Sequence, residues 1–314
     1  MKIISAEDVH AALSYPAMID ALQEGYSSQF NMPPRQVFLL DDNDDNHDAF
    51  AVLPSWNDDL IAVKAFTYFP DNPGPEYKSL YSKIMIFDRA HGEPLALVDG
   101  TSVTFWRTAG ISGLATRLLA REDSETLLVL GTGNLSTYSI RANCSVRPIK
   151  NVLVWGRTAG KAQAVVDQMN GELEGINCSV TEDREAACGQ ADIIVSVTGS
   201  HEPVVLGDWV KPGTHTDFIG NHHATKRECD SALVTKSKVY ADSYVNAFKE
   251  AGELLVPIEE GVFTKEDVVG ELTEMCAGTV PLRESDDEIT MFKSIGMAYS
   301  DLVGAGVAYR AATS

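Results

Sequence analysis

The motif that most clearly indicates a binding site is Gly131-Thr132-Gly133, which follows an apolar run at residues 127–130 and precedes a segment with helical spacing. The first glycine permits a tight turn, and the second lets the backbone approach a bound group closely. Free N–H groups at the helix start, Asn134-Leu135, then attract an anion. Ser136 replaces the third glycine of the usual pattern. An ordinary strand-to-helix turn is the alternative, but the flanking strands and helices favour a site for a dinucleotide pyrophosphate.

The next predicted strand, at residues 152–155, helps to select between the two forms of such a cofactor. In NAD-binding proteins this strand usually ends in Asp or Glu, whose carboxylate accepts a hydrogen bond from the ribose 2′-hydroxyl. Here it is followed by Gly156-Arg157-Thr158. A guanidinium can grip a 2′-phosphate that a carboxylate would repel. We therefore expect NADPH, with NADH possible, and contacts from Arg157 and Thr158. The alternative for Arg157 is a solvent-facing loop residue.

A later apolar run at residues 193–197 leads into Ser196-Val197-Thr198-Gly199. In a sheet of this kind the carboxyl end of such a strand faces the nicotinamide. Ser196, Val197 and Thr198 are therefore predicted to contact the cofactor, and a plain turn is the alternative.

Three cations in the first part of the chain are candidates for a substrate site. Lys64 interrupts the apolar run at residues 61–66, and strand alternation places it on the side opposite its two neighbours, where it could face a cleft. Arg107 lies at the start of a long helical segment, and Arg35 follows two prolines. Taken alone, each of them is more simply interpreted as a surface cation.

From about residue 123 the chain alternates between short apolar segments and helical ones. Strands are expected at residues 127–130, 152–155, 176–180, 193–197, 214–219 and 238–241, with helices at 135–146 and 159–169. Short strands that are apolar on both faces, with helices between them, are typical of a parallel, doubly wound Rossmann sheet.

The first 120 residues have an α+β pattern. Ser5 and Asp8 form a capping box that predicts a short helix, and Pro16 suits the first turn of a second helix ending near residue 29. Strands are expected at residues 36–40, 49–53, 60–69, 83–88 and 94–98, and a long helix at 104–121. A last helical stretch is expected at about 289–312.

Bulk composition excludes several classes of function. The net charge of −20 argues against a nucleic-acid binder, although a few local arginines can still attract a small anion. The acidic run from Asp41 to Asp48 is expected to be a solvated loop, with a cation site as the weaker alternative. No apolar run suits a membrane span and no secretory signal is visible, so we expect a soluble, cytoplasmic protein. The five cysteines lack metal or redox spacing and fit buried thiols in a reducing compartment; no metal is expected.

A series of short motifs runs in order along nearly the whole chain. They are Pro34-Arg35-Gln36-Val37, Val63-Lys64, Phe69-Pro70-Asp71-Asn72-Pro73, residues 92–100, residues 104–109, Gly131-Thr132-Gly133, Lys211-Pro212-Gly213-Thr214-His215, Phe292-Lys293-Ser294-Ile295-Gly296 and Asp301-Leu302. Taken together, they resemble the ornithine cyclodeaminase/μ-crystallin family.

The resemblance implies a Rossmann domain, residues 123–292, inserted into a substrate-binding and dimerisation domain made of residues 1–122 and 293–314. It implies a homodimer. It also implies that Arg35 and Arg107 clamp a substrate carboxylate while Lys64 contacts the reacting end of the substrate. Thr108 and Ser294 lie within matching stretches and are expected to contact the cofactor.

The chain departs from the family pattern after the strand expected at residues 214–219. Cyclodeaminase and alanine dehydrogenase members carry an Asp in a motif like Gly-Ala-Asp-x-Pro-x-x-x-Glu-Leu, and His222 stands at that position here. In the cyclodeaminase the acid is tied to handling an amino group and releasing ammonia, so its loss argues against that reaction. His222 could relay a proton instead, because imidazole titrates near neutral pH; a structural histidine is the alternative.

We therefore expect a ketimine reductase that uses NADPH to reduce a cyclic imino acid, Δ1-pyrroline-2-carboxylate or Δ1-piperideine-2-carboxylate, to proline or pipecolate. Lys64 and His222 would handle the proton at the imine nitrogen. Two alternatives remain open. One is ornithine cyclodeaminase or alanine dehydrogenase activity on the same frame. The other is a non-catalytic NADPH-binding protein of the μ-crystallin kind, which the retained lysine and arginines disfavour.

Overall fold

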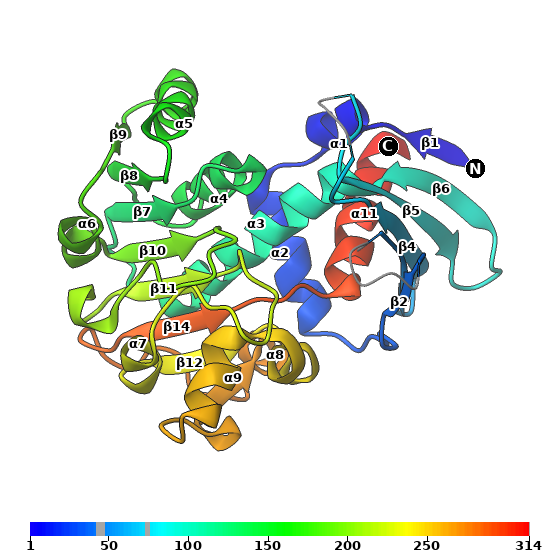
Figure 1. Ribbon diagram of the computed structural model, residues 1–314. Coiled ribbons are helices and arrows are strands. Elements are labelled where there is room, and N and C mark those ends of the chain that lie inside the picture. The colour runs from blue at the N-terminus through cyan, green and yellow to red at the C-terminus, as the bar shows by residue number, and fades with distance from the viewer. Residues whose placement is uncertain (42–47, 73–75, 314) are drawn as a thin grey trace. The chain divides into compact units, whose positions relative to one another are not determined.

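The computed structural model describes residues 1–41, 48–72 and 76–313, and its ribbon is drawn in Figure 1. The chain divides into two compact units, one formed by Met1–Arg107 and Met297–Ser314 and the other by Thr108–Gly296. The division falls inside helix α3 (Gly100–Leu119), whereas the sequence places a domain boundary after residue 122, beyond this helix. Most of the acidic run, residues 42–47, and Pro73 of a matching motif lie outside the described residues.

The first unit is built on a six-stranded sheet with the strand order β1-β6-β5-β4-β3-β2. Its strands are β1 (Lys2–Ile4), β2 (Gln36–Leu39), β3 (Ala49–Trp56), β4 (Leu60–Tyr68), β5 (Leu80–Asp88) and β6 (Pro94–Asp99). β1 pairs with β6 in parallel, and all other neighbours are antiparallel. The sequence predicts every strand of this sheet except β1, whose three residues are too few to show an alternating pattern.

The first unit also contains the helices α1 (Ala6–Ala12), α2 (Tyr15–Tyr26) and α11 (Ala298–Thr313), together with the start of α3. The predicted capping box is present, since Ser5 Oγ accepts from the Asp8 N–H at 3.1 Å and the Asp8 carboxylate accepts from the Ser5 N–H at 2.8 Å. α11 packs against β3, β4 and β5. Gly306 permits this packing, because a Cβ there would lie 3.0 Å from the side chain of Leu60 in β4. Gly304 permits the close approach of α3, because a Cβ there would lie 2.9 Å from the Val103 side chain.

The second unit contains an eight-stranded, all-parallel sheet with the order β13-β12-β14-β11-β10-β7-β8-β9. The strands are β7 (Thr126–Leu130), β8 (Asn151–Trp155), β9 (Asn177–Val180), β10 (Ile193–Ser196), β11 (His215–Phe218), β12 (Lys238–Ala241), β13 (Val268–Glu271) and β14 (Thr290–Lys293). Figure 1 shows β8, β7, β10, β11, β14 and β12 stacked in this order. The chain proceeds from β7 outward to β9 and then returns to β10 on the other side of β7. The strand order therefore reverses between β7 and β10, where doubly wound proteins bind their ligands.

Helices cover both faces of this sheet. They are α4 (Asn134–Cys144), α5 (Ala159–Glu172), α6 (Arg184–Gln190), α7 (Ser231–Thr235), α8 (Tyr244–Glu250), α9 (Gly252–Glu259) and α10 (Leu272–Ala277). Leu127 and Val129 of β7 belong to one apolar core, with residues of α4 and α5, whereas Leu128 and Leu130 belong to another, with residues of α6, α7 and α9. The predicted doubly wound Rossmann architecture is confirmed. Among the described residues, no helix has both the length and the apolar character that crossing a membrane requires.

The helical stretch predicted at residues 289–312 is wrong over its first part. Thr290–Lys293 form β14, which is fully buried and pairs with β11 on one side and β12 on the other. The chain then turns at Gly296, where φ is 93°, and α11 begins only at Ala298. Four buried residues are too few to reveal a period, and two neighbouring strands supply the pairing that decides the conformation. β13 is likewise absent from the prediction.

Strand β11 places two ionisable side chains, His215 and Asp217, in the fully buried interior of the second unit. Burial raises the pKa of Asp217 to about 7, because an ionised carboxylate loses its hydration there. Burial lowers the pKa of His215 to about 3 for the same reason, so this imidazole is neutral in the folded protein at neutral pH. The two groups therefore make opposite contributions to the pH dependence of folding.

We expect Asp217→Asn to stabilise the protein relative to the wild type above pH 7. Because the folded pKa is raised, the carboxyl group favours the folded state fully below about pH 4, and this contribution is lost as the pH rises to about 7. Between these limits the difference in unfolding free energy between the variant and the wild type should change by up to about 4 kcal/mol. Urea denaturation at a series of pH values measures it. Asp208→Asn, at an exposed position, is the control, and parallel pH curves for Asp217→Asn and wild type would contradict the assignment.

Candidate active site

The loop after β7 has the geometry of a phosphate-binding turn. Gly131 has a φ of 119°, and a Cβ there would lie 2.8 Å from both the side chain and the carbonyl oxygen of Val197. Gly133 is the N-cap of α4, makes no side-chain cap bond and has open space where a Cβ would stand. Ser136 is buried and donates its hydroxyl to the Gly131 carbonyl at 2.7 Å. A hydrogen bond inside the loop thus holds its conformation, and the N–H groups at the start of α4 can donate to an anion.

A cavity of about 250 Å³ adjoins this loop. Of the residues predicted to contact the cofactor, its lining includes Gly131, Thr132, Gly133, Arg157, Thr158, Val197 and Thr198. The lining also includes Lys161, an exposed residue in the first turn of α5 to which the sequence analysis gave no role. Arg157 and Lys161 are the cations of the described lining, which contains no Asp or Glu.

The loops that follow β10 and β11 are joined by one buried carboxylate, that of Glu228. Its Oε1 accepts from the Ser196 hydroxyl at 2.5 Å and from the Thr198 N–H and hydroxyl, both at 2.8 Å. Its Oε2 accepts from the N–H groups of Gly220 at 2.8 Å and Asn221 at 3.1 Å. These bonds fix two loops at the carboxyl edge of the sheet. Glu228 occupies the glutamate position of the motif that contains His222, and this was the signal in the sequence that could have identified it.

His222 follows the segment that Glu228 holds. The Asn221 carbonyl accepts from the buried Lys293 ammonium at 2.8 Å, and the Asn221 side chain accepts from the His223 N–H at 3.1 Å. Lys293 in turn pairs with Glu253 at 2.9 Å. The backbone on both sides of His222 is therefore fixed, while His222 itself is exposed. Its role as a proton relay stays a prediction.

Ser294, which the sequence predicts at the cofactor, is buried just after β14. Its hydroxyl donates to Asp242 Oδ2 at 2.8 Å, and the same oxygen accepts from the N–H groups of Ile295 at 2.8 Å and Gly296 at 2.6 Å. The hydroxyl hydrogens of Ser294 and Ser196 are thus bonded within the protein. Contacts of these two serines with a cofactor stay predictions, as do those of Thr108 in α3 and of Asn134 and Leu135 at the start of α4.

In the first unit, Lys64 of β4 and Arg107 of α3 share one carboxylate oxygen of α11. Lys64 Nζ donates to Asp301 Oδ1 at 3.1 Å, and Arg107 Nε donates to the same oxygen at 3.0 Å. Lys64 also donates to the Thr104 hydroxyl oxygen at 2.6 Å, and Thr104 donates to the Gly100 carbonyl at 2.7 Å. Lys64 is 5% exposed and Asp301 1% exposed. The structure therefore brings two of the three predicted substrate cations into one buried cluster.

Burial changes the proton affinity of this lysine. Loss of hydration lowers the pKa of Lys64, the negative charge of Asp301 opposes this effect, and the positive charge of Arg107 adds to it. An ammonium group that holds its proton less tightly is a better proton donor.

Arg35, the third predicted cation, is exposed and precedes the edge strand β2. The neighbouring Gln36 pairs with Val52, and Leu53 pairs with Lys64. Extending the first register by one residue puts Arg35 opposite Leu53, on the row of the sheet that contains Lys64. Two strand spacings of about 5 Å separate positions of this kind.

The family model for the ornithine cyclodeaminase/mu-crystallin family matches residues 2–314. The chain belongs to this family. The Δ1-pyrroline-2-carboxylate reductase of Colwellia psychrerythraea is 48% identical to it over 307 residues, 97% of each chain. The enzyme of the same name from Paracoccus denitrificans is 35% identical over 312 residues, covering 96% of this chain and 94% of its own.

Solved structures of the ornithine cyclodeaminase/mu-crystallin family share its fold. The Thermococcus litoralis Δ1-pyrroline-2-carboxylate reductase, in complex with NADH and L-proline, matches with a TM-score of 0.93 and 32% identity, over 100% of this chain and 98% of that one. An archaeal alanine dehydrogenase dimer with bound NAD matches with a TM-score of 0.91 and 29% identity, over 100% of this chain and 96% of that one.

Asp301 is the residue of this family member that sequence reasoning most clearly missed. It lies in a matching stretch, but no role was assigned to it. In α11 it occupies the buried side together with Ala298, Ala305 and Ala308, at helical spacing. An acid on an otherwise apolar helix face is the signal that could have found it, because a buried charge requires a partner.

Proposed function

We propose that the chain is a reductase that converts a cyclic imino acid, Δ1-pyrroline-2-carboxylate and/or Δ1-piperideine-2-carboxylate, into proline or pipecolate with a nicotinamide cofactor. The proposal rests mainly on the buried cluster of Lys64 and Arg107, in a chain 48% identical to the Colwellia reductase. The related Thermococcus reductase binds NADH and L-proline.

Arg107 is the first candidate for binding the substrate carboxylate. Within the described residues only its Nε is bonded to Asp301, so its two terminal amino groups remain available as donors. Two parallel N–H groups match the two oxygens of a carboxylate and fix its orientation as well as its charge. Arg35, just before β2, is proposed as the second cation of this clamp, because continuing the β2–β3 register by one residue would align it with Leu53, the partner of Lys64.

Lys64 is proposed to protonate the imine nitrogen or keep it protonated, because a protonated imine is the better electrophile. The imine carbon accepts the hydride, the π electrons move to nitrogen, and the nitrogen keeps its proton, so the C=N double bond becomes the single bond of a secondary amine. His222 is proposed to assist through water, since it is exposed on a fixed loop.

The residues of the phosphate loop fit a dinucleotide. Gly131 cannot carry a side chain without contacting Val197, Gly133 leaves open space, and the start of α4 carries no side-chain cap. A reduced nicotinamide supplies the hydride when bound. We propose NADPH as the preferred form, because Arg157 and Lys161 line the adjoining cavity, whose described lining contains no Asp or Glu.

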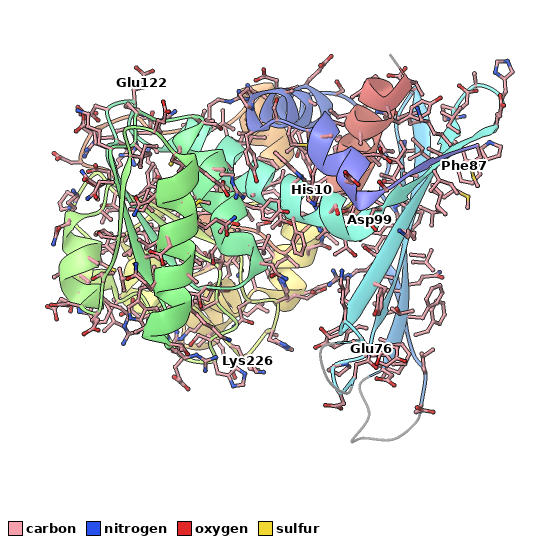
Figure 2. The ribbon with its side chains drawn as sticks, turned by 90° about the horizontal axis from the view of Figure 1, so that it is seen from above. His10, Glu76, Phe87, Asp99, Glu122 and Lys226 are labelled. Atoms are coloured by element: carbon pink, nitrogen blue, oxygen red, sulfur yellow. The ribbon has the colours of Figure 1, made fainter. Side chains whose placement is uncertain are left out.

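We propose that two copies of the chain form a homodimer through the sheet face of the first unit that lies opposite α11. A continuous cross-strand row on that face, Pro54, Val63, Met85 and Leu97, is half-buried in the single chain. Phe87, two residues after Met85 and on the same face, is labelled in Figure 2. The five cysteines are all free thiols, which is compatible with the cytoplasmic location that we propose.

The function is tested by following NADPH oxidation with each imino acid. The wild type should turn over at least one of them, and Lys64→Ala should reduce kcat by about 100-fold or more because the proton donor is lost. NADPH affinity, measured by calorimetry, should be unchanged. Lys150→Met, which removes an exposed lysine paired with Glu125, is the matched control. A wild type inactive with both imino acids, yet consuming NADH with pyruvate and ammonia or releasing ammonia from ornithine, would overturn the proposal.

Cofactor preference is tested at Arg157. Arg157→Ala should raise the KM for NADPH by about 10- to 100-fold, since a hydrogen bond between charged groups is lost. The KM for NADH, which has no 2′-phosphate, should change little. Arg141→Ala, which removes an arginine paired with Glu172 outside the cavity lining, controls for the loss of a positive charge. Equal effects on both cofactors would argue against a 2′-phosphate contact.

The proposed dimer is tested by light scattering during size-exclusion chromatography. The wild type should have about twice the mass of one chain. Met85→Lys should shift the population toward the monomer, because it places a charge in the apolar row, and Met85→Leu should not. A monomeric wild type at micromolar concentration would refute the assembly.

A further inference from the structure

We infer that Asp301 is the positioning residue of the substrate site: its carboxylate fixes the Lys64 ammonium and the Arg107 guanidinium relative to each other. The inference rests on the proposed function, in which those two cations contact the substrate. It assigns to α11, at the far end of the chain, a residue without which β4 and α3 would carry two buried cations and no anion between them.

The geometry leaves little freedom to the cluster. One oxygen, Oδ1, accepts from both Lys64 at 3.1 Å and Arg107 at 3.0 Å, so each cation is bonded to the same point. Thr104 supplies a second anchor for Lys64 from within α3, at 2.6 Å. The side chains of Lys64 and Asp301 are 6% and 2% exposed, and that of Arg107 is 11% exposed. Asp301 also lies in the first turn of α11, where the helix dipole favours a negative charge.

A comparison with Glu228 separates this role from a purely structural one. Glu228 uses both carboxylate oxygens for bonds to neighbouring loops. Asp301 uses one oxygen for two cations, and its other oxygen, Oδ2, is buried without a hydrogen-bond partner among the described residues. Leaving a buried acceptor unpaired carries a free-energy penalty, so this cluster is not arranged for maximum stability. It is arranged around the two cations.

The charges of the cluster also suit a small carboxylic acid. With Lys64 protonated, two positive charges face the single negative charge of Asp301, which leaves one positive charge in a buried place. A bound carboxylate would balance it. Without Asp301 the two cations would repel each other at close range, and Lys64 would release its proton more readily. Asp301 therefore supports a lysine that is buried and still charged before the reaction.

The test compares Asp301→Asn with the wild type, because asparagine keeps the shape and removes the charge. We expect kcat/KM for the imino acid to fall by about 100-fold as the cations move, while the Kd for NADPH stays within about twofold of the wild type, an effect small on the scale of one lost hydrogen bond. The alkaline limb of the pH profile should shift to lower pH. The reason is that activity falls as Lys64 deprotonates, and removing a neighbouring negative charge lowers the pKa of Lys64.

Two further variants distinguish positioning from a general loss of stability. Thr104→Val removes the neutral anchor of Lys64, so it should lower kcat/KM without an equal shift of the alkaline limb. Asp301→Glu restores the charge on a longer side chain and should return the limb toward its wild-type position. If Asp301→Asn does not fold, the pH profiles of these two variants test the inference. The alkaline limb should stay near its wild-type position in Asp301→Glu, and kcat/KM should fall in Thr104→Val without a large shift of that limb. A wild-type pH profile and kcat/KM in Asp301→Asn would overturn the inference.

A readout that needs no activity separates the failure of this inference from the failure of the proposed function. Protein containing ¹³C-labelled lysine is titrated by NMR, and the Lys64 Cε resonance is identified by its absence in Lys64→Met. Its midpoint should lie at lower pH in Asp301→Asn than in the wild type, even if neither imino acid is a substrate. An unchanged midpoint in Asp301→Asn would overturn the role of Asp301. A shifted midpoint in that variant, together with a wild type that reduces neither imino acid, would overturn only the proposed reaction.

Discussion

A buried ammonium group must be paired, and the first unit is organised around this requirement. Lys64 loses nearly all of its hydration in β4, and the only anion bonded to it within the described residues is Asp301. That residue lies 237 positions later in the chain. The two ends of the polypeptide therefore have to fold into one unit, with α11 against β4, which contains the lysine, and against the neighbouring strands β3 and β5. The glycines of α11 that allow close packing support this ion pair, because they let the helix come near enough for Asp301 to accept a hydrogen bond.

In the second unit a buried carboxylate, that of Glu228, meets a different structural requirement. The carboxyl edge of a parallel sheet exposes loop N–H groups, and two such loops would be mobile unless something bonded to both. Glu228 does this with hydrogen bonds from four residues on two loops, and Lys293 adds a bond to the Asn221 carbonyl. Preorganised loops lose little entropy on binding. Carboxylates in the two units thus serve opposite purposes: Glu228 holds backbone, and Asp301 holds cationic side chains.

Much of this arrangement could be predicted from local sequence. The turn at Gly131 and the fold around it follow from glycine spacing and from short apolar runs, which are properties of adjacent residues. Lys64 was identified because a charge in a strand breaks a local pattern. Asp301 and β14 were not recognised, because their conformations depend on partners far away in the chain: Lys64 and Arg107 for the acid, and β11 and β12 for the strand. Lys161 joins the cavity only through the fold of α5.

The overall charge of the protein makes these local cations more important. With a net charge of −20, the chain repels a dinucleotide phosphate or an imino-acid carboxylate at long range. At physiological ionic strength, however, interactions between exposed charges are screened beyond about 8 Å. An anion that has come within this distance responds mainly to the nearest groups, which are Arg157 and Lys161 in one unit and Arg107 with Lys64 in the other. The acidic surface can therefore coexist with the two proposed anion-binding sites, provided that any carboxylate in them is bonded to the cations. Among the described residues, the cavity next to Gly131 meets this condition because no acid lines it, and the Lys64 cluster meets it because its acid, Asp301, is bonded to both cations.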